Sequence, residues 1–131
     1  KALNALEVKF GASHSEFKIT NEGKVYAIEV GARMGGDFIG SDLVYLSTGY
    51  DFVKGVIDVS LGQFSLPIIK NNKYSGVYFL SKNSEKLVPI FNQTNQFEEK
   101  KEIFNTNLLE INNSNDRSGY LIYQSNKKII L

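Results

Sequence analysis

Several residue types and patterns are missing from this 131-residue chain, and each absence narrows what it can be. There is no cysteine, which excludes a disulfide framework and thiol chemistry and weakly favours the cytoplasm. Acids and bases nearly balance at a net charge of +1, so no basic field predicts a nucleic-acid or anionic-membrane partner. Apolar runs fall far short of the roughly 20 residues that a membrane span needs, and no signal-peptide pattern is present.

What is present is enough for a core. Apolar residues make up 42% of the chain, with nine Phe and seven Tyr, which is typical of one compact domain and not of disorder. The sequence begins with Lys1 rather than Met, inside a helix-like stretch over 1–6. We therefore interpret it as a piece of a longer cytoplasmic protein.

Hydrophobic periodicity predicts an α+β fold with two parts. Alternating apolar and polar residues over 13–20 and 24–30 predict an antiparallel β-hairpin, and 3.6-residue spacing predicts helices over 37–48 and 51–61. We expect Asp37 and Asp51 to cap these helices and Gly49 and Gly62 to end them.

The second half reads as a small β-rich subdomain. We expect a hairpin of strands over 74–82 and 86–91, a strand near 104–111 and another over 119–124. The segment 97–103 fits either a short charged helix or a loop. A boundary near Pro67 then divides the chain into 1–67 and 68–131.

The register of the first hairpin decides whether two glutamates meet. If its loop holds an even number of residues centred on Glu22 and Gly23, Glu16 faces Glu29. We expect a four-residue loop over 21–24, because Glu22 is unfavourable at positive φ in a two-residue type I′ turn. This register sends the acids to one face and the large apolar groups to the other. The apolar pairs are Phe17 with Ile28 and Ile19 with Tyr26.

Two carboxylates directly opposite each other destabilise a sheet unless something compensates. A bridging Mg²⁺ or Mn²⁺ would do so, because both ions prefer oxygen ligands. Protonation of one acid, or a nearby Lys18 or Arg33, would also do so, and exposed glutamates on a hairpin are often simply solvated. The sequence leaves these alternatives open.

Arg33 follows the second strand and is the main candidate for anion binding. Its planar fork suits a phosphate or carboxylate, although it could equally neutralise Glu29. Gly35 and Gly36 allow close backbone approach to a ligand, and free amides at the following helix start would favour an anion. His14 lies on the same strand face as Glu16. Its alternative roles are a substrate or cofactor contact, an acid–base group, or a hydrogen-bonding neighbour without chemistry.

These residues resemble a known family. Residues 11–17 (GASHSEF) and 26–36 (YAIEVGARMGG) resemble the carboxy-terminal catalytic segment of the ATP-grasp ligases. Residues 46–52 (LSTGYDF) are similar to the branch that includes carbamoyl-phosphate-synthase-like proteins and L-amino-acid ligases. The match is dense over 11–62. It is looser over 76–91 and 118–124, which are similar to the family's small β-rich terminal subdomain.

The resemblance implies a reaction and assigns roles. It implies that Glu16 and Glu29 bind the Mg²⁺ ions that bridge the ATP phosphates, and that Arg33 contacts the transferred phosphoryl group. The turn at Gly35 and Gly36 would line the substrate carboxylate pocket. A carboxylate would attack the γ-phosphate of ATP, and an amine would displace phosphate from the resulting acyl-phosphate.

The chain also departs from the family pattern. Many relatives carry a metal-binding Asn where this chain has Gly31, and nothing here matches the family's glycine-rich lid, phosphate-binding lysines or adenine pocket. We expect those parts upstream, so the isolated chain should not turn over. Expected partners are small carboxylate and amine substrates, the upstream chain and a second copy in a homodimer. The rival hypothesis is a non-catalytic binding or assembly module. A metal-dependent hydrolase has less support, because there is no His-rich or further carboxylate cluster.

Overall fold

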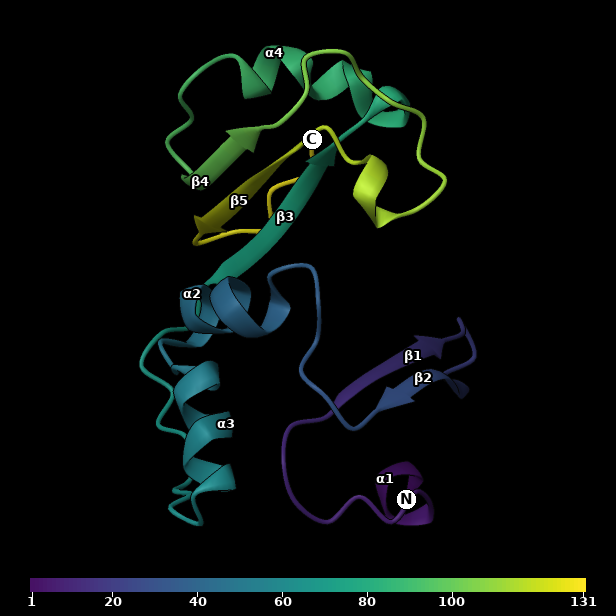
Figure 1. Ribbon diagram of the computed structural model, residues 1–131, viewed down its shortest axis with the longest axis vertical. Helices are drawn as coiled ribbons and strands as arrows, with labels where there is room; N and C mark the ends of the chain where they lie inside the picture. The colour runs from purple at the N-terminus through teal and green to yellow at the C-terminus, as the bar shows by residue number, and fades with distance from the viewer.

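The computed structural model describes residues 1–131 and contains two separate antiparallel sheets (Figure 1). In Figure 1 the two-stranded sheet and α1 lie at one end of the molecule, the three-stranded sheet lies at the other, and α2 lies between them. The strands are β1 (His14–Ile19), β2 (Val25–Gly31), β3 (Tyr74–Leu80), β4 (Glu98–Ile103) and β5 (Gly119–Ser125). The helices are α1 (Ala2–Ala5), η1 (Ile39–Leu43), α2 (Val44–Thr48), α3 (Phe52–Ser60), η2 (Lys82–Leu87), α4 (Val88–Phe91) and η3 (Ser114–Asp116). The predicted α+β class is confirmed.

The helices after the first hairpin form largely as predicted. The Asp51 carboxylate accepts a 2.9 Å hydrogen bond from the Lys54 amide and caps α3. Gly49 and Gly62 follow α2 and α3 in left-handed conformations, at φ +72° and +71°. None of the helices has the length and apolar character needed to cross a bilayer.

The core lies in the second half of the chain. β5 is the central strand of its sheet, in the order β3-β5-β4, and its residues Gly119–Tyr123 are all buried. Leu121 is fully buried and packs with Leu80, Leu87, Phe91 and Tyr123. The second sheet therefore has its own apolar core.

The predicted strand over 86–91 is wrong, because this segment is helical. The chain leaves β3 through a capping box in which the Ser81 amide donates to Ser84 Oγ at 2.9 Å. Pro89 then lies in the first turn of α4, where its missing amide costs no hydrogen bond. η2 and α4 thus replace the expected hairpin.

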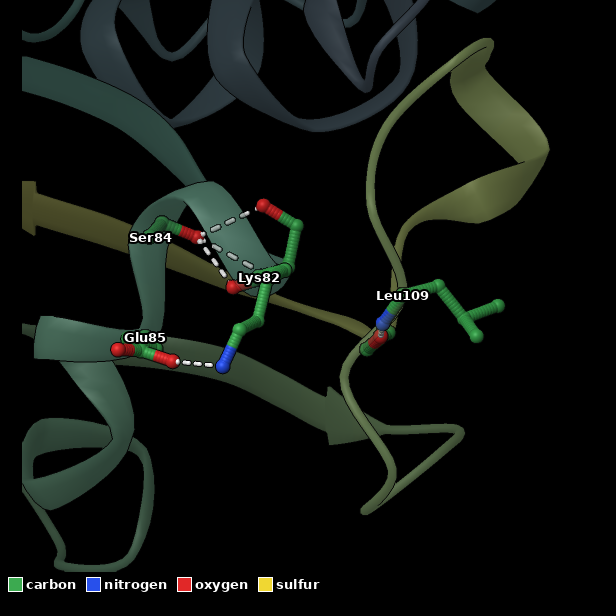
Figure 2. Close-up of polar contacts among 6 residues, drawn as sticks. Lys82, Ser84, Glu85 and Leu109 are labelled. Carbon is green, nitrogen blue, oxygen red and sulfur yellow. Dashed lines mark hydrogen bonds and ion pairs between the residues drawn. The ribbon is translucent and has the colours of Figure 1, made fainter.

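The predicted strand near 104–111 is also wrong, and the strand lies earlier, at β4. All residues of this edge strand except Ile103 are charged, and Lys101 pairs with Glu98 at 2.9 Å. The segment after it makes isolated backbone contacts instead. The Lys82 amide donates to the Leu109 carbonyl at 2.8 Å. The Lys82 ammonium pairs with Glu85 at 2.6 Å (Figure 2).

Candidate metal and phosphate site

Glu16 and Glu29 are directly opposite each other on β1 and β2. The pairs of His14 with Gly31 and Ser15 with Val30 follow the predicted register. Towards the turn the predicted register is wrong by one residue, since Phe17 faces Ala27 and Lys18 faces Tyr26. A β-bulge between the two parts of the ladder leaves Ile28 as the extra residue on β2. The carboxylates therefore meet as expected, although the path to that pairing differs.

The turn explains the difference. The predicted four-residue loop over 21–24 is wrong, because the five residues 20–24 separate the paired Ile19 and Val25. The Thr20 amide still donates to the Lys24 carbonyl at 2.9 Å, which leaves an odd number of residues beyond the last hydrogen bond. Gly23 adopts φ +79° within it. An odd loop shifts the strands by one position, and the bulge shifts them back before the acids. As a result, Tyr26 lies opposite Lys18, on the face of the carboxylates, and not opposite Ile19.

Arg33 contacts the second acid. Its Nη2 lies 2.5 Å from Glu29 Oε1, and its Nη1 donates to the Met34 carbonyl at 3.0 Å. A Cβ at Gly31 would lie 3.4 Å from Arg33 Cγ and 3.6 Å from Glu29 Oε1. The glycine found at the position of the expected Asn thus gives the arginine room to fold back. The arrangement neutralises Glu29 and leaves other guanidinium N–H groups free.

His14 lies beside the first acid, opposite Gly31. Its Nε2 is 3.6 Å from Glu16 Oε1, and its buried Nδ1 has no hydrogen-bond partner. The imidazole is thus close enough to orient or stabilise the Glu16 carboxylate. Its role as a cofactor or substrate contact stays a prediction.

The two facing carboxylates suit a Mg²⁺ ion that takes its other ligands from phosphate and water. No group of three or more His, Cys, Asp or Glu side chains converges anywhere in the chain. Mg²⁺ is commonly held by one or two carboxylates, with phosphate oxygens and water as its other ligands. Glu16 and Glu29 could supply the two carboxylates, so the site suits an ion that arrives with a nucleotide.

The turn at Gly35 and Gly36 is followed by two residues with an unusual backbone conformation. Gly35 and Gly36 do not have positive φ, whereas the next two residues, Asp37 and Phe38, have φ +51° and +65°. A Cβ at Gly35 would lie 3.0 Å from the Ile39 side chain, but a Cβ at Gly36 would meet nothing within 4 Å. Packing against Ile39 therefore explains the glycine at position 35, whereas the space over Gly36 is open.

Asp37 does not cap the following helix, so the predicted cap at this residue is wrong. The N-cap is Phe38, without a side-chain bond, and the helix begins with the π-helical turn η1 at Ile39. The Ile39 amide donates to the Gly36 carbonyl at 2.9 Å and so is not free for an anion. Asp37 instead accepts two hydrogen bonds from Arg117, at 2.5 and 2.9 Å.

Arg117 is the residue near this site that sequence reasoning missed. It lies 80 residues from Asp37, between the segments 104–111 and 119–124 in which the sequence predicted strands. Its guanidinium holds the pKa of the Asp37 carboxyl below its ordinary value, against the opposing effect of partial burial. One signal could have found it, because Arg33 and Arg117 are the only arginines in a chain otherwise supplied with lysine.

Comparisons with known proteins address the fold. No protein-family model matches the sequence, and no curated protein matches it. Among solved structures, an L-amino acid ligase from Bacillus licheniformis matches with a TM-score of 0.66 and 22% identity, over 96% of this chain and 35% of that one. A phosphoribosylglycinamide synthetase from Anaerococcus prevotii matches with a TM-score of 0.65 and 18% identity, over 96% of this chain and 34% of that one.

Both neighbours are ATP-grasp enzymes, and the chain spans about a third of the length of each. A likeness at these identities establishes a shared fold. The chain therefore has the fold of a segment of the ATP-grasp enzymes, as its sequence resemblance implied.

Proposed function

We propose that this chain is part of an ATP-dependent ligase that activates a carboxylate as an acyl-phosphate and joins it to an amine. The observation that carries the proposal is the pairing of Glu16 with Glu29, with Arg33 against the second acid. This arrangement lies at the end of a hairpin in a fold shared with two ATP-grasp enzymes. Small-molecule carboxylates and amines are the proposed substrates.

Each residue has a role in the proposed reaction. Glu16 and Glu29 would hold Mg²⁺, which neutralises phosphate charge when bound. Arg33 would bind the phosphoryl group as a carboxylate oxygen bonds to the γ-phosphorus and ADP leaves. The amine then bonds to the acyl carbon, phosphate leaves with the bonding electrons, and the amine loses a proton.

The turn after Arg33 is the proposed substrate contact. The open space over Gly36 gives a ligand access to the backbone, which supports this role. At Gly35 the neighbouring Ile39 side chain fills the equivalent space, so this residue contributes mainly to the shape of the turn. His14 would complete the set through its contact with Glu16.

We assign the metal and phosphate site to 1–67 and treat 68–131 as the terminal subdomain. The lid, the phosphate-binding lysines and the adenine pocket would lie outside these residues, in keeping with a chain that spans a third of its structural neighbours. The isolated chain should therefore bind nucleotide weakly and release no ADP, whereas the full-length protein should be active.

The test is ADP release by the full-length protein with a panel of amino acids and small carboxylates, each with and without an amine. Glu29→Gln should lower kcat/KM by about 100-fold or more, because charge stabilisation of the phosphates is lost. Glu22→Gln is the matched control, since Glu22 lies in the turn of the same hairpin and contacts none of these residues. ADP release that is unaffected by Glu29→Gln would remove the proposed role of this site, and no ADP release with any substrate pair would favour a non-catalytic binding or assembly module that keeps the scaffold.

A further inference from the structure

We propose that Asp37, Phe38 and Arg117 are positioning residues, through which the second half of the chain holds the Gly35–Gly36 turn in place. The proposal rests on the proposed function of that turn. It assigns to the 68–131 region a direct part in the candidate site, beyond packing against the first half.

The first observation is an unusual backbone. Asp37 and Phe38 are consecutive non-glycine residues whose backbones both adopt the left-handed conformation, which glycine occupies far more readily. The two glycines that precede them do not use this conformation. Such residues persist only where the surrounding structure over-determines them, and they cluster at functional sites. Contacts from outside the turn must therefore keep it in this conformation.

Arg117 holds the first of the two residues. It meets both oxygens of Asp37 with two nitrogens, at 2.5 and 2.9 Å, which fixes orientation as well as distance. Its guanidinium carbon lies 3.7 Å from the centre of the Phe79 ring on β3. The arginine is thus itself fixed by the second sheet, with a side-chain exposure of 23%.

The second sheet also holds Phe38. The Phe38 ring lies 4.5 Å from the ring of Tyr120 on β5 and 6.3 Å from that of Phe79. A cavity of about 430 Å³ adjoins these rings and Arg117, so the contact borders open space and not the buried core. Two contacts therefore determine where the turn lies, one with rings of the second sheet and one with Arg117, which itself stacks on that sheet.

The experiment compares variants of the full-length protein in two measurements. Arg117→Lys keeps the charge but loses the two-nitrogen contact, and Arg117→Met loses both. Lys82→Met is the control, because it removes an ion pair of the same region, the exposed Lys82–Glu85 pair of Figure 2, which does not touch the turn. The measurements are hydrogen exchange and the separate KM values for carboxylate and ATP.

Hydrogen exchange reports on the turn without any activity. The amides of Ile39, Asp42 and Leu43 donate to the carbonyls of Gly36 and Phe38. We expect their exchange to rise about tenfold in Arg117→Met and less in Arg117→Lys, while Lys82→Met exchanges as the wild type. Unchanged exchange at these amides in Arg117→Met would overturn the proposal, whether or not the protein is a ligase.

The kinetic measurement separates positioning from general stability. Arg117→Met should raise the carboxylate KM about tenfold and leave the ATP KM unchanged, because only the turn is displaced. The double variant Asp37→Asn, Arg117→Met should have the same carboxylate KM as Arg117→Met alone, since both substitutions remove the same contact. A uniform loss of activity, or effects that add, would contradict positioning. If the wild type itself shows no ADP release, the proposed function fails, and the exchange result alone decides this inference.

Discussion

The two sheets of this molecule differ in what holds them together. In the hairpin the apolar side chains of Phe17, Ile19 and Ile28 are 53%, 69% and 62% exposed. In the second sheet Leu121 and Ile122 are fully buried. The candidate catalytic residues thus lie on the sheet that buries little apolar surface of its own, and an isolated two-stranded hairpin is marginally stable at best.

This difference shows how stability and function are distributed along the chain. The second sheet supplies the core and, through Arg117, an anchor for the turn that follows the hairpin. The hairpin supplies opposed like charges, which weaken a sheet. The stable region therefore supports the region where candidate chemistry is concentrated, and the following predictions test that division.

The largest effect is expected from core truncation. Leu121→Ala should lower the free energy of unfolding by about 2–5 kcal/mol, because it leaves a cavity in the centre of the second sheet. Ile19→Ala, at a 69% exposed position of the hairpin, should cost less than about 1 kcal/mol. Urea denaturation measures both values. Similar losses at the two positions would show that the hairpin has a core of its own.

A smaller effect is expected from two glycine substitutions. Tyr123 lies across the ladder from Gly76, where a Cβ would come within 2.6 Å of its ring. Gly76→Val should therefore cost about 1–3 kcal/mol of unfolding free energy. Gly36→Ala should change stability by less than about 0.5 kcal/mol, because the added Cβ meets nothing.

Gly36→Ala should lower activity more than it lowers stability. If a ligand approaches the backbone at Gly36, the added methyl group should lower kcat/KM by about tenfold. The same assay of ADP release in the full-length protein measures it. Full activity of Gly36→Ala would remove Gly36 from the proposed substrate contact.

The smallest effect is a pH dependence that links the two regions. The pKa of Asp37 is lowered in the folded state by Arg117, so its ion pair contributes fully above the ordinary pKa of an aspartate. That contribution is lost as the pH falls through the lowered value. Because Asp37 is 49% exposed, we expect about 1 kcal/mol or less.

Unfolding of the wild type and of Asp37→Asn between about pH 3 and pH 7 measures this contribution as a difference. The difference should be constant in the upper part of this range and shrink at its acidic end. A difference that grows towards low pH would contradict a lowered pKa.

Local signals carried most of what the sequence predicted. The pairing of Glu16 with Glu29 depends on one turn and a two-residue period, and α3 depends on its Asp51 cap. The bulge at Ile28 was invisible, because an even loop without a bulge places the acids in the same way. That prediction was therefore correct for the acids and wrong for Tyr26.

The remaining errors have one local cause and one long-range cause. The segment 86–91 has apolar residues that suit a strand, and the capping box at Ser81 and Ser84 overrides them. The Asp37–Arg117 contact joins residues 80 positions apart, and neither segment has a local pattern that predicts the other as its partner. A single sequence gives no information on which polar loop returns to which turn.

The bulge at Ile28 has a consequence for how this hairpin tolerates change. It lies between the turn and the two carboxylates, and it offsets the odd length of the loop. Deleting Ile28 alone would remove the bulge and still leave Glu16 opposite Glu29, because the pairs on both sides of the bulge are kept. The bulge is therefore a point where a change in residue spacing is absorbed before it reaches the carboxylates. We expect the facing of the two acids to tolerate a one-residue insertion or deletion between the turn and Glu29, because gain or loss of a bulge can accommodate it.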